Sequence, residues 1–385
     1  MEQGVQLFSG LGSLGASTLG YLVPFVFVLT LVVFFHELGH FLVARWCGVV
    51  VKVFSVGFGP ELFGWTDRKG TRWRVSAIPL GGYVKFLGDE NAASATDREA
   101  ATHLSPQEYK HAFAAKHVSQ RAAIVAAGPL ANFVLAVAIF AAIFAVFGRQ
   151  VTSPRVDTVT EGSAAEVAGF KPGDLIVAIE GAPIETFADL QRIVTVSAGQ
   201  PLTVTVERAG ERLDLVATPE MKETPDRFGN VHRIGMLGIG RSATEADIIT
   251  QRFSIPSAIW LGTQESWFVV SRTFAYLAGV IVGRESPDQL GGPIRVAQVS
   301  GQVATVGFLP LLNLAAILSV SIGLINLFPI PMLDGGHLLY FAVEAVRGRP
   351  LSERAQDMGF RIGLALVILL MIFATWNDIL HLAKS

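Results

Sequence analysis

Two long stretches without a charged side chain constrain this chain more than any other feature. Residues 122–147 and 306–328 contain no Asp, Glu, Lys or Arg. A helix that crosses a membrane needs about 20 mostly apolar residues, and both stretches reach that length. Two further stretches, 21–43 and 362–382, are apolar along most of their length. The sequence therefore predicts a polytopic α-helical membrane protein with four transmembrane helices.

The composition agrees with a membrane protein and excludes several other classes. Apolar residues make up 51% of the 385 residues and charged residues only 16%, below the roughly 25% of soluble domains. The same values exclude a disordered chain. A net charge of −2 provides no basic field, so we expect a lipid bilayer and no nucleic acid among the partners. Cys47 is the only cysteine, which excludes an internal disulfide and a CxxC motif.

The distribution of Lys and Arg predicts which loops lie in the cytoplasm, because short cytoplasmic loops are enriched in these residues. Residues 44–120 carry ten of them and residues 347–361 carry four, whereas residues 1–43 carry none. We therefore expect both basic loops on the cytoplasmic side of the membrane. We then expect the opposite side of the membrane to hold the N-terminus, the segment 149–305 and the C-terminus.

A fifth apolar stretch, residues 267–282, allows two interpretations. It has only 16 residues and contains Arg272. These features favour an amphipathic helix lying in the membrane interface over a full span. The choice affects the topology, because a fifth span would reverse the direction of the stretch at 306–328.

Two shorter segments have local structure that the sequence predicts directly. Residues 52–86 are rich in Val, Phe, Trp and Tyr with partial alternation, which predicts β structure with a turn at 67–70. Gly81 and Gly82 indicate a bend or a close approach of another backbone. Ser105 begins a capping box with proline at the first helical position, so we expect a helix that runs from there toward the second span.

Residues 150–241 form the one clear globular module in the sequence. Short β-prone runs alternate with a predicted helix at about 186–197. The run that starts at Gly162, GSAAEVAGFKPGDLI, resembles the PDZ signature of bacterial proteases. PDZ domains bind extended peptides by adding a strand to a sheet edge. We expect one inserted PDZ domain of α+β type, which either binds a peptide ligand or excludes partners by size.

The first predicted span contains a metal-binding motif. His36, Glu37 and His40 form HExxH, which on a helix places both imidazoles on one face, four residues apart. Imidazole is a common zinc ligand, and the adjacent glutamate can act as a general base. Ionisable groups inside a membrane helix are costly, so three within five residues indicate a functional site.

A zinc site of this kind needs a third protein ligand, and the sequence offers candidates beyond the third span. Asp334 and His337 both follow a break at Pro329 and Pro331. If residues 267–282 do not cross the membrane, the third span runs in the same direction as the first, and this segment arrives at the depth of HExxH. Cys47 is a further candidate, although we favour a buried thiol there.

The combined motifs resemble one known family. HExxH in the first span, the segments GFGP and GGYVKFLGDE, a PDZ insert and NxxPxPxLDG are similar to the site-2 protease family of intramembrane zinc metalloproteases, and most of all to its bacterial RseP type. The resemblance covers nearly the whole chain. RseP-type relatives often carry tandem PDZ domains, and this sequence shows one.

The resemblance implies roles for individual residues. It implies one Zn²⁺ per chain, a catalytic base, and a β segment at 57–86 whose edge is presented to substrate. The residues concerned are the zinc ligands His36, His40 and Asp334, the base Glu37, and the substrate-binding residues Asn326, Gly81 and Gly82.

The resulting expectation is an intramembrane zinc endopeptidase of the bacterial inner membrane, with both termini in the periplasm. Its partners would be single-span membrane proteins, cut in regulated intramembrane proteolysis, for example of an anti-sigma factor, or signal-peptide remnants. An intramembrane metal-ion transporter is the alternative, since His and Asp also mark ion pathways. The lack of an internal inverted repeat disfavours a transporter, and the intact HExxH disfavours an inactive scaffold.

These features predict four parts of the chain. The expected parts are an N-terminal membrane part at 1–147, a periplasmic PDZ domain at 150–241, a periplasmic amphipathic linker region at 242–305 and a C-terminal membrane part at 306–385.

Overall fold

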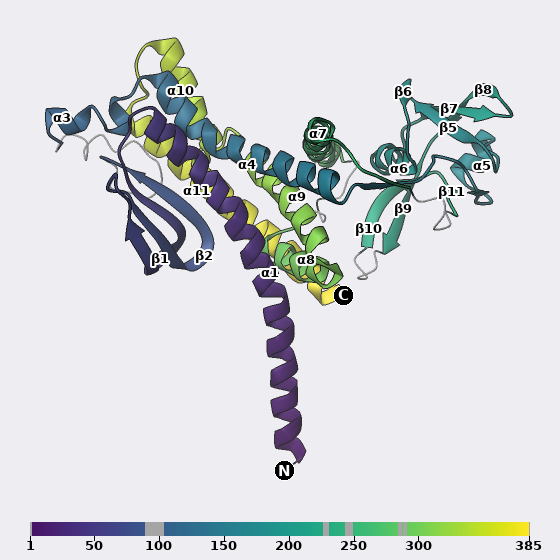
Figure 1. Ribbon diagram of the computed structural model, residues 1–385, viewed down its shortest axis with the longest axis horizontal. Coiled ribbons are helices and arrows are strands. Elements are labelled where there is room, and N and C mark those ends of the chain that lie inside the picture. Colours follow the sequence, from purple (N-terminus) through teal and green to yellow (C-terminus); the bar gives the residue numbers. More distant parts are fainter. Residues whose placement is uncertain are drawn as a thin grey trace. The chain divides into compact units, whose positions relative to one another are not determined.

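The computed structural model describes residues 2–88, 104–225, 231–242, 249–283, 287 and 291–384 (Figure 1). It divides into two compact units, the first formed by Met1–Ala141 with Ile259–Lys384 and the second by Ala142–Ala258. The last two residues of GGYVKFLGDE, and parts of the predicted linker region, lie outside the described residues.

Four helices are long and apolar enough to cross a membrane within the described ranges. These are α1 (Glu2–Trp46), α4 (Val118–Val146), α9 (Phe308–Asn326) and α11 (Glu353–Lys384), and the apolar part of α1 begins at Gly20. The prediction of a four-span membrane protein is confirmed. The helix that contains the fourth predicted span is longer than that span, because α11 begins nine residues before residue 362 and includes Arg354 and Arg361 in its first turns.

The third span is bounded by residues that a helix does not accommodate. Gly307, with a φ of 143°, separates α9 from α8 (Pro293–Val306). Beyond Asn326, Pro329 and Pro331 prevent the helix from continuing. The chain then enters α10 (Asp334–Arg347).

The amphipathic stretch before α8 is helical over a longer range than predicted. Helix α7 (Ile255–Ile281) starts well before residue 267. It is not among the four helices that qualify as spans within the described residues. This agrees with the prediction that residues 267–282 do not cross the membrane.

The predicted β segment is a long hairpin of β1 (Val51–Thr66) and β2 (Arg72–Phe86), which curls beside α1 (Figure 1). Residues 53–56 of β1 pair twice, once with residues 72–75 and once with residues 82–85 of β2. The first half of β1 therefore lies between two parts of β2. Residues 82–86 consequently form an edge of this sheet.

The hairpin turn is fastened to the last turn of α1. Asp67 pairs with Arg45 and accepts a hydrogen bond from Trp73 Nε1 at 3.1 Å and from the backbone N–H of Thr71. Burial raises the pKa of Asp67, but these hydrogen bonds outweigh it and lower the pKa to about 2. The carboxylate therefore ties the tip of the sheet to the end of the first span.

The helix predicted from Ser105 is much shorter than expected. Its capping box is present, with Ser105 Oγ accepting from the N–H of Glu108. However, α3 (Pro106–Tyr109) ends after one turn, and a 3₁₀ turn, η1 (Phe113–Ala115), precedes α4. The chain turns here because Phe113 is buried in the core, stacked on Phe86 with 5.2 Å between ring centroids.

The second unit has its own sheet, with strand order β6-β5-β7-β8. The predicted helix is confirmed as α6, which Thr186 caps together with Asp189. The core of this unit includes Ile176 and Val204, both without exposed surface. The main elements are α5 (Ala164–Ala168), β5 (Leu175–Ile179), β6 (Ala182–Pro183), α6 (Phe187–Val196), β7 (Leu202–Arg208) and β8 (Glu211–Ala217).

Short strand pairs complete the second unit. They pair β12 with β3, β11 with β4, and β10 with β9. Their bounds are β3 (Arg149–Val151), β4 (Thr158–Val159), β9 (Glu220–Pro225), β10 (Val231–Met236), β11 (Ile239–Gly240) and β12 (Ile249–Gln251).

Candidate metal centre and active site

The HExxH motif lies in the last third of α1, as the sequence predicts. His36 and His40 are one helical turn apart, so their rings lie on the same face, with 4.8 Å between centroids. Their Nε2 atoms are 3.2 Å apart. Two imidazole nitrogens therefore face the same point inside the helix bundle.

Asp334, the first residue of α10, completes the cluster. Its Oδ2 lies 3.2 Å from His36 Nε2 and 3.5 Å from His40 Nε2. The double-proline turn that places it there contains Met332 in the left-handed region, with a φ of 91°. Burial raises the pKa of Asp334, but the adjacent His40 and His36 outweigh this effect and lower it, so the carboxylate is ionised.

These three atoms have the spacing that a zinc ion requires. Donors held about 2.0–2.2 Å from zinc at tetrahedral angles lie about 3.3–3.5 Å from one another. The observed separations are 3.2, 3.2 and 3.5 Å. The buried Oδ2 of Asp334 accepts no hydrogen bond from the described residues. A metal ion would satisfy this oxygen, so the three residues fit a zinc site.

Helix α4 holds His40 in place. His40 Nδ1–H donates to the backbone oxygen of Ile124 at 2.9 Å, which leaves Nε2 free to bind a metal. A Cβ atom at Gly128 would lie 2.2 Å from His40 Nε2, so only glycine fits at this position. This role of α4 could not be predicted from the sequence, because a glycine in an apolar run gives no signal of its partner.

A cavity of about 170 Å³ lies against the three residues. Glu37, Asn326 and Gly82 line it, so the structure brings these predicted residues to the same site. His337 also lines it but is not part of the three-ligand cluster. The remaining lining residues are Tyr83, Val84, Met332, Leu333 and Phe360.

Two predicted candidates do not reach the cavity. Gly81 is not among the lining residues, and a Cβ there would lie 2.4 Å from the ring of Phe58. It therefore serves the packing of the hairpin. Cys47 packs at the edge of the hydrophobic cluster between α1 and the hairpin and is not part of the metal cluster.

Gly82 sets the distance between the hairpin and α1. A Cβ at this position would lie 2.8 Å from Ser55 O and 2.9 Å from both Glu37 Cγ and Val33 Cγ1. Any side chain would therefore push the sheet away from Glu37. The predicted close approach is observed, and the backbone that approaches is that of the sheet edge.

A buried ion pair joins α10 to α4. Arg121 Nη2 donates to Glu344 Oε1 at 2.5 Å, and the Arg121 guanidinium lies over the ring of Phe341. Both side chains are largely buried. Losing one partner of such a pair leaves an uncompensated charge. The pair thereby fixes the helix that carries Asp334, and sequence reasoning missed it because the partners are more than 200 residues apart.

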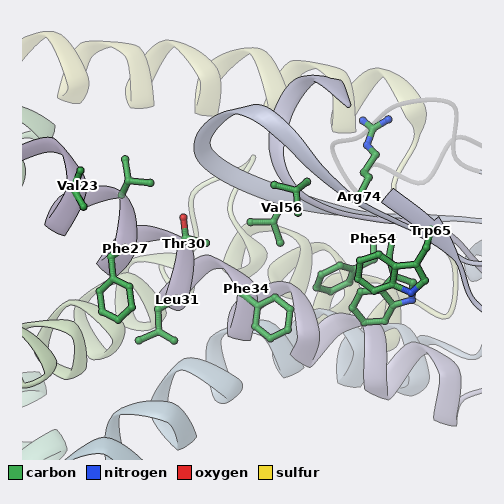
Figure 2. A pocket seen from close by; sticks show the side chains of 12 residues that line it. Val23, Phe27, Thr30, Leu31, Phe34, Phe54, Val56, Trp65 and Arg74 are labelled. Atoms are coloured by element: carbon green, nitrogen blue, oxygen red, sulfur yellow. The ribbon is translucent and has the colours of Figure 1, made fainter. Parts of the chain in front are cut away.

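An apolar groove runs between α1 and the hairpin (Figure 2). It encloses about 620 Å³, and Arg74 is the one charged residue among the twelve that line it. Phe27 and Phe34 of α1 lie on one side, and Phe54 and Trp65 of the hairpin lie on the other. Along α1 the groove ends within one turn of the HExxH motif.

Comparisons with known proteins identify the family of this chain. The model of peptidase family M50 matches residues 24–370. A protein of Agrobacterium fabrum, named as a candidate zinc metalloprotease, is 53% identical over 360 residues, which cover 94% of this chain and 96% of that protein. A similarly named protein of Rhizobium meliloti is 52% identical over 95% of this chain and 98% of its own length. Metalloprotease MmpA of Caulobacter vibrioides is 42% identical, and the match covers 93% of this chain and 95% of MmpA.

Proposed function

We propose that this protein cleaves peptide bonds within the transmembrane segments of other membrane proteins. The chain belongs to peptidase family M50, the site-2 proteases, and is a zinc metalloprotease of the membrane. The observation that carries this proposal is the location of the cluster. His36 and His40 belong to the part of α1 from Gly20 to Trp46, which is long and predominantly apolar, and Asp334 lies beside them.

His36, His40 and Asp334 are assigned as the ligands of one zinc ion. Bound there, Zn²⁺ supplies a Lewis acid that polarises the scissile carbonyl. Glu37 lines the same cavity and is assigned as the general base. Its carboxylate accepts a proton from the attacking water and returns it to the amide nitrogen as the C–N bond breaks.

The sheet edge at residues 82–86 is assigned to substrate binding. A transmembrane helix hides its amides in internal hydrogen bonds, so it must unwind before it can be cut, and unpaired amides cost several kcal/mol in hydrocarbon. An extended substrate added to this edge would regain backbone partners. Gly82 and Val84 of this edge line the cavity, and so does the Asn326 amide, which we assign to a substrate backbone contact.

The apolar groove is assigned to the part of the substrate that remains helical. Apart from Thr30, the α1 residues that line it between Val23 and Phe34 are apolar (Figure 2). Phe34 lies two residues before His36 in the sequence. An apolar transmembrane segment of a single-span protein suits such a surface, and a polar peptide does not. The groove thus supports membrane proteins as the substrate class.

The second unit is assigned as a PDZ domain on the periplasmic side of a bacterial inner membrane, with both chain termini periplasmic. The PDZ-like sequence run and the positive charges of the opposite loops support this assignment. Its role is to select substrates, by binding an extended peptide or by excluding bulky outer domains.

Replacing Glu37 with Gln tests the catalytic assignment. Glutamine keeps the size of the side chain but cannot accept the proton, so cleavage of co-expressed single-span proteins should stop. The purified variant should still hold about one zinc per chain, measured by atomic emission. Loss of zinc together with cleavage would instead make Glu37 a ligand. Metal transport by vesicles containing the variant would favour a transporter.

A further inference from the structure

Asn132 is a fully buried polar residue in the middle of α4, beside the metal cluster. Its Nδ2 lies 3.3 Å from His36 Nδ1, and its side chain has no exposed surface. Its Oδ1 is buried without a hydrogen-bond partner among the described residues. A buried acceptor without a donor is costly, so this amide requires an explanation.

The orientation of the amide decides which nitrogen of His36 carries the proton. With Nδ2 toward His36, Nδ1 must act as acceptor, and the proton of the neutral imidazole must then lie on Nε2. Nε2 is the atom that faces Asp334 and His40. A metal ligand must be unprotonated, so this orientation conflicts with zinc binding.

Turning the amide by 180° places Oδ1 toward His36 and moves Nδ2 to the buried position that Oδ1 holds in the structure. The oxygen and nitrogen of an asparagine amide have nearly the same shape, and their assignment follows from the hydrogen-bond network. After the turn, Oδ1 accepts from His36 Nδ1–H, so the buried acceptor is satisfied. His36 Nε2 then presents its lone pair to the metal.

We propose that Asn132 is a positioning residue for the metal centre, whose side-chain oxygen fixes the tautomer and ring orientation of His36. This inference rests on the proposed function, in which His36 is a zinc ligand. It gives His36 the support that the backbone oxygen of Ile124 gives His40. One helix, α4, thereby orients both histidines of α1.

The third span holds Asn132 in this position. Ser319 Oγ of α9 donates to the backbone oxygen of Asn132 at 2.8 Å. A Cβ at Gly323, also on α9, would lie 3.2 Å from Asn132 Cβ and 3.0 Å from Pro129 O, so the two helices pack closely here. The asparagine has no room to move away from His36.

Zinc affinity, measured by chelator competition on the purified full-length protein in detergent, tests this role. Asn132→Leu keeps the approximate size but removes the acceptor, and its zinc affinity should fall about 10–100-fold. Asn132→Asp keeps an acceptor oxygen and should retain most of the affinity. Asn313→Leu makes the same change at an exposed position of α9 and should leave the affinity unchanged.

A second measurement does not depend on a variant that folds. In zinc-loaded protein labelled with ¹⁵N-histidine, the Nδ1 of His36 should be protonated and its Nε2 should not. A proton on Nε2, or an unchanged zinc affinity in a folded Asn132→Leu variant, would overturn the inference. Failure of the wild-type protein to bind zinc at all would overturn the proposed function instead.

Discussion

The two β structures of this protein differ in how their apolar side chains are covered. In the second unit, Ile176 and Val204 have no exposed surface, because the sheet closes over its own core. In the hairpin β1–β2, by contrast, Leu62 is 71% exposed and Phe63 is 63% exposed. A sheet with such a surface needs lipid or a bound polypeptide against it. The first sheet is therefore suited to the membrane, and the second to water.

The comparison of the two β structures also separates the part of the protein that holds the metal cluster from the part proposed to select substrates. Every side chain of the metal cluster belongs to the first unit, and the hairpin edge reaches the cavity. Within the described residues, the second unit adds no member to that cluster. Damage to the two sheets should therefore have different consequences.

Removing the third ligand should have the largest effect. Asp334→Ala leaves two histidines, which cannot hold zinc tightly. Zinc content and cleavage should therefore both fall by more than about 100-fold, because losing a ligand costs more than losing a residue that only hydrogen-bonds to a ligand. Zinc analysis and cleavage of a model substrate measure this. His337→Ala is the matched control, and it should keep its zinc. The reverse pattern would make His337 the ligand.

A side chain at the hairpin edge should have the next largest effect. Gly82→Val would displace the sheet from Glu37, and a misplacement of about 1 Å can cost about 100-fold in rate. Zinc content should be unchanged, because no ligand is touched.

The matched change in the other sheet is Val204→Ala. It should destabilise the second unit by about 2 kcal/mol through the cavity it leaves, and it should leave cleavage of substrates with short outer segments intact. Equal losses of cleavage in both variants would remove the distinction between the two sheets.

Deleting residues 154–235 should change substrate choice without removing chemistry. We expect a severalfold rise in cleavage of substrates with large outer domains, compared in membranes with the intact enzyme, and an unchanged zinc content. If the shortened enzyme binds zinc but cuts no substrate, including those with short outer segments, the second unit positions substrates and does not filter them.

The smallest expected effect concerns the ion pair and hydrogen bonds of Asp67, which hold the hairpin turn against α1. A folded-state pKa of about 2, below the ordinary value of about 3.9, means that Asp67 stabilises the fold above about pH 4 and loses this contribution as the pH falls through 2. The side chain is 21% exposed, so the contribution should stay below about 1 kcal/mol.

Denaturant unfolding of the protein in detergent at pH 6 and pH 3 measures this effect. Asp67→Asn should be slightly less stable than wild type at pH 6, and the difference should shrink at pH 3. A constant difference would assign the effect to packing rather than to charge.

The parts of the fold that follow local patterns could be predicted from the sequence. The apolar runs, two of them without any charge, predicted the four spans, and the i, i+4 spacing placed His36 and His40 on one face. The helix after Ser105 was predicted too long, because its capping signal carries no information about the burial of Phe113. Local propensity does not report where a helix must stop to let a side chain enter the core.

The contacts that complete the site could be predicted only in part. Topology indicated that Asp334 and His337 reach the depth of HExxH, and the structure shows which of them joins the cluster. Gly128 and Asn132 carry no recognisable signal, because their function depends on a helix about 90 residues away in sequence. Such outer contacts become visible only when the helices are packed.

The origin of the metal ligands at opposite ends of the chain has a consequence for biosynthesis. His36 and His40 leave the ribosome early, whereas Asp334 follows some three hundred residues later, on a helix that must dock through Arg121 and Glu344. A nascent chain that has inserted only its first spans contains Glu37, the proposed general base, but only two of the three residues of the metal cluster. The protease therefore stays inert in the membrane until translation is nearly finished, and truncated products cannot cut their neighbours.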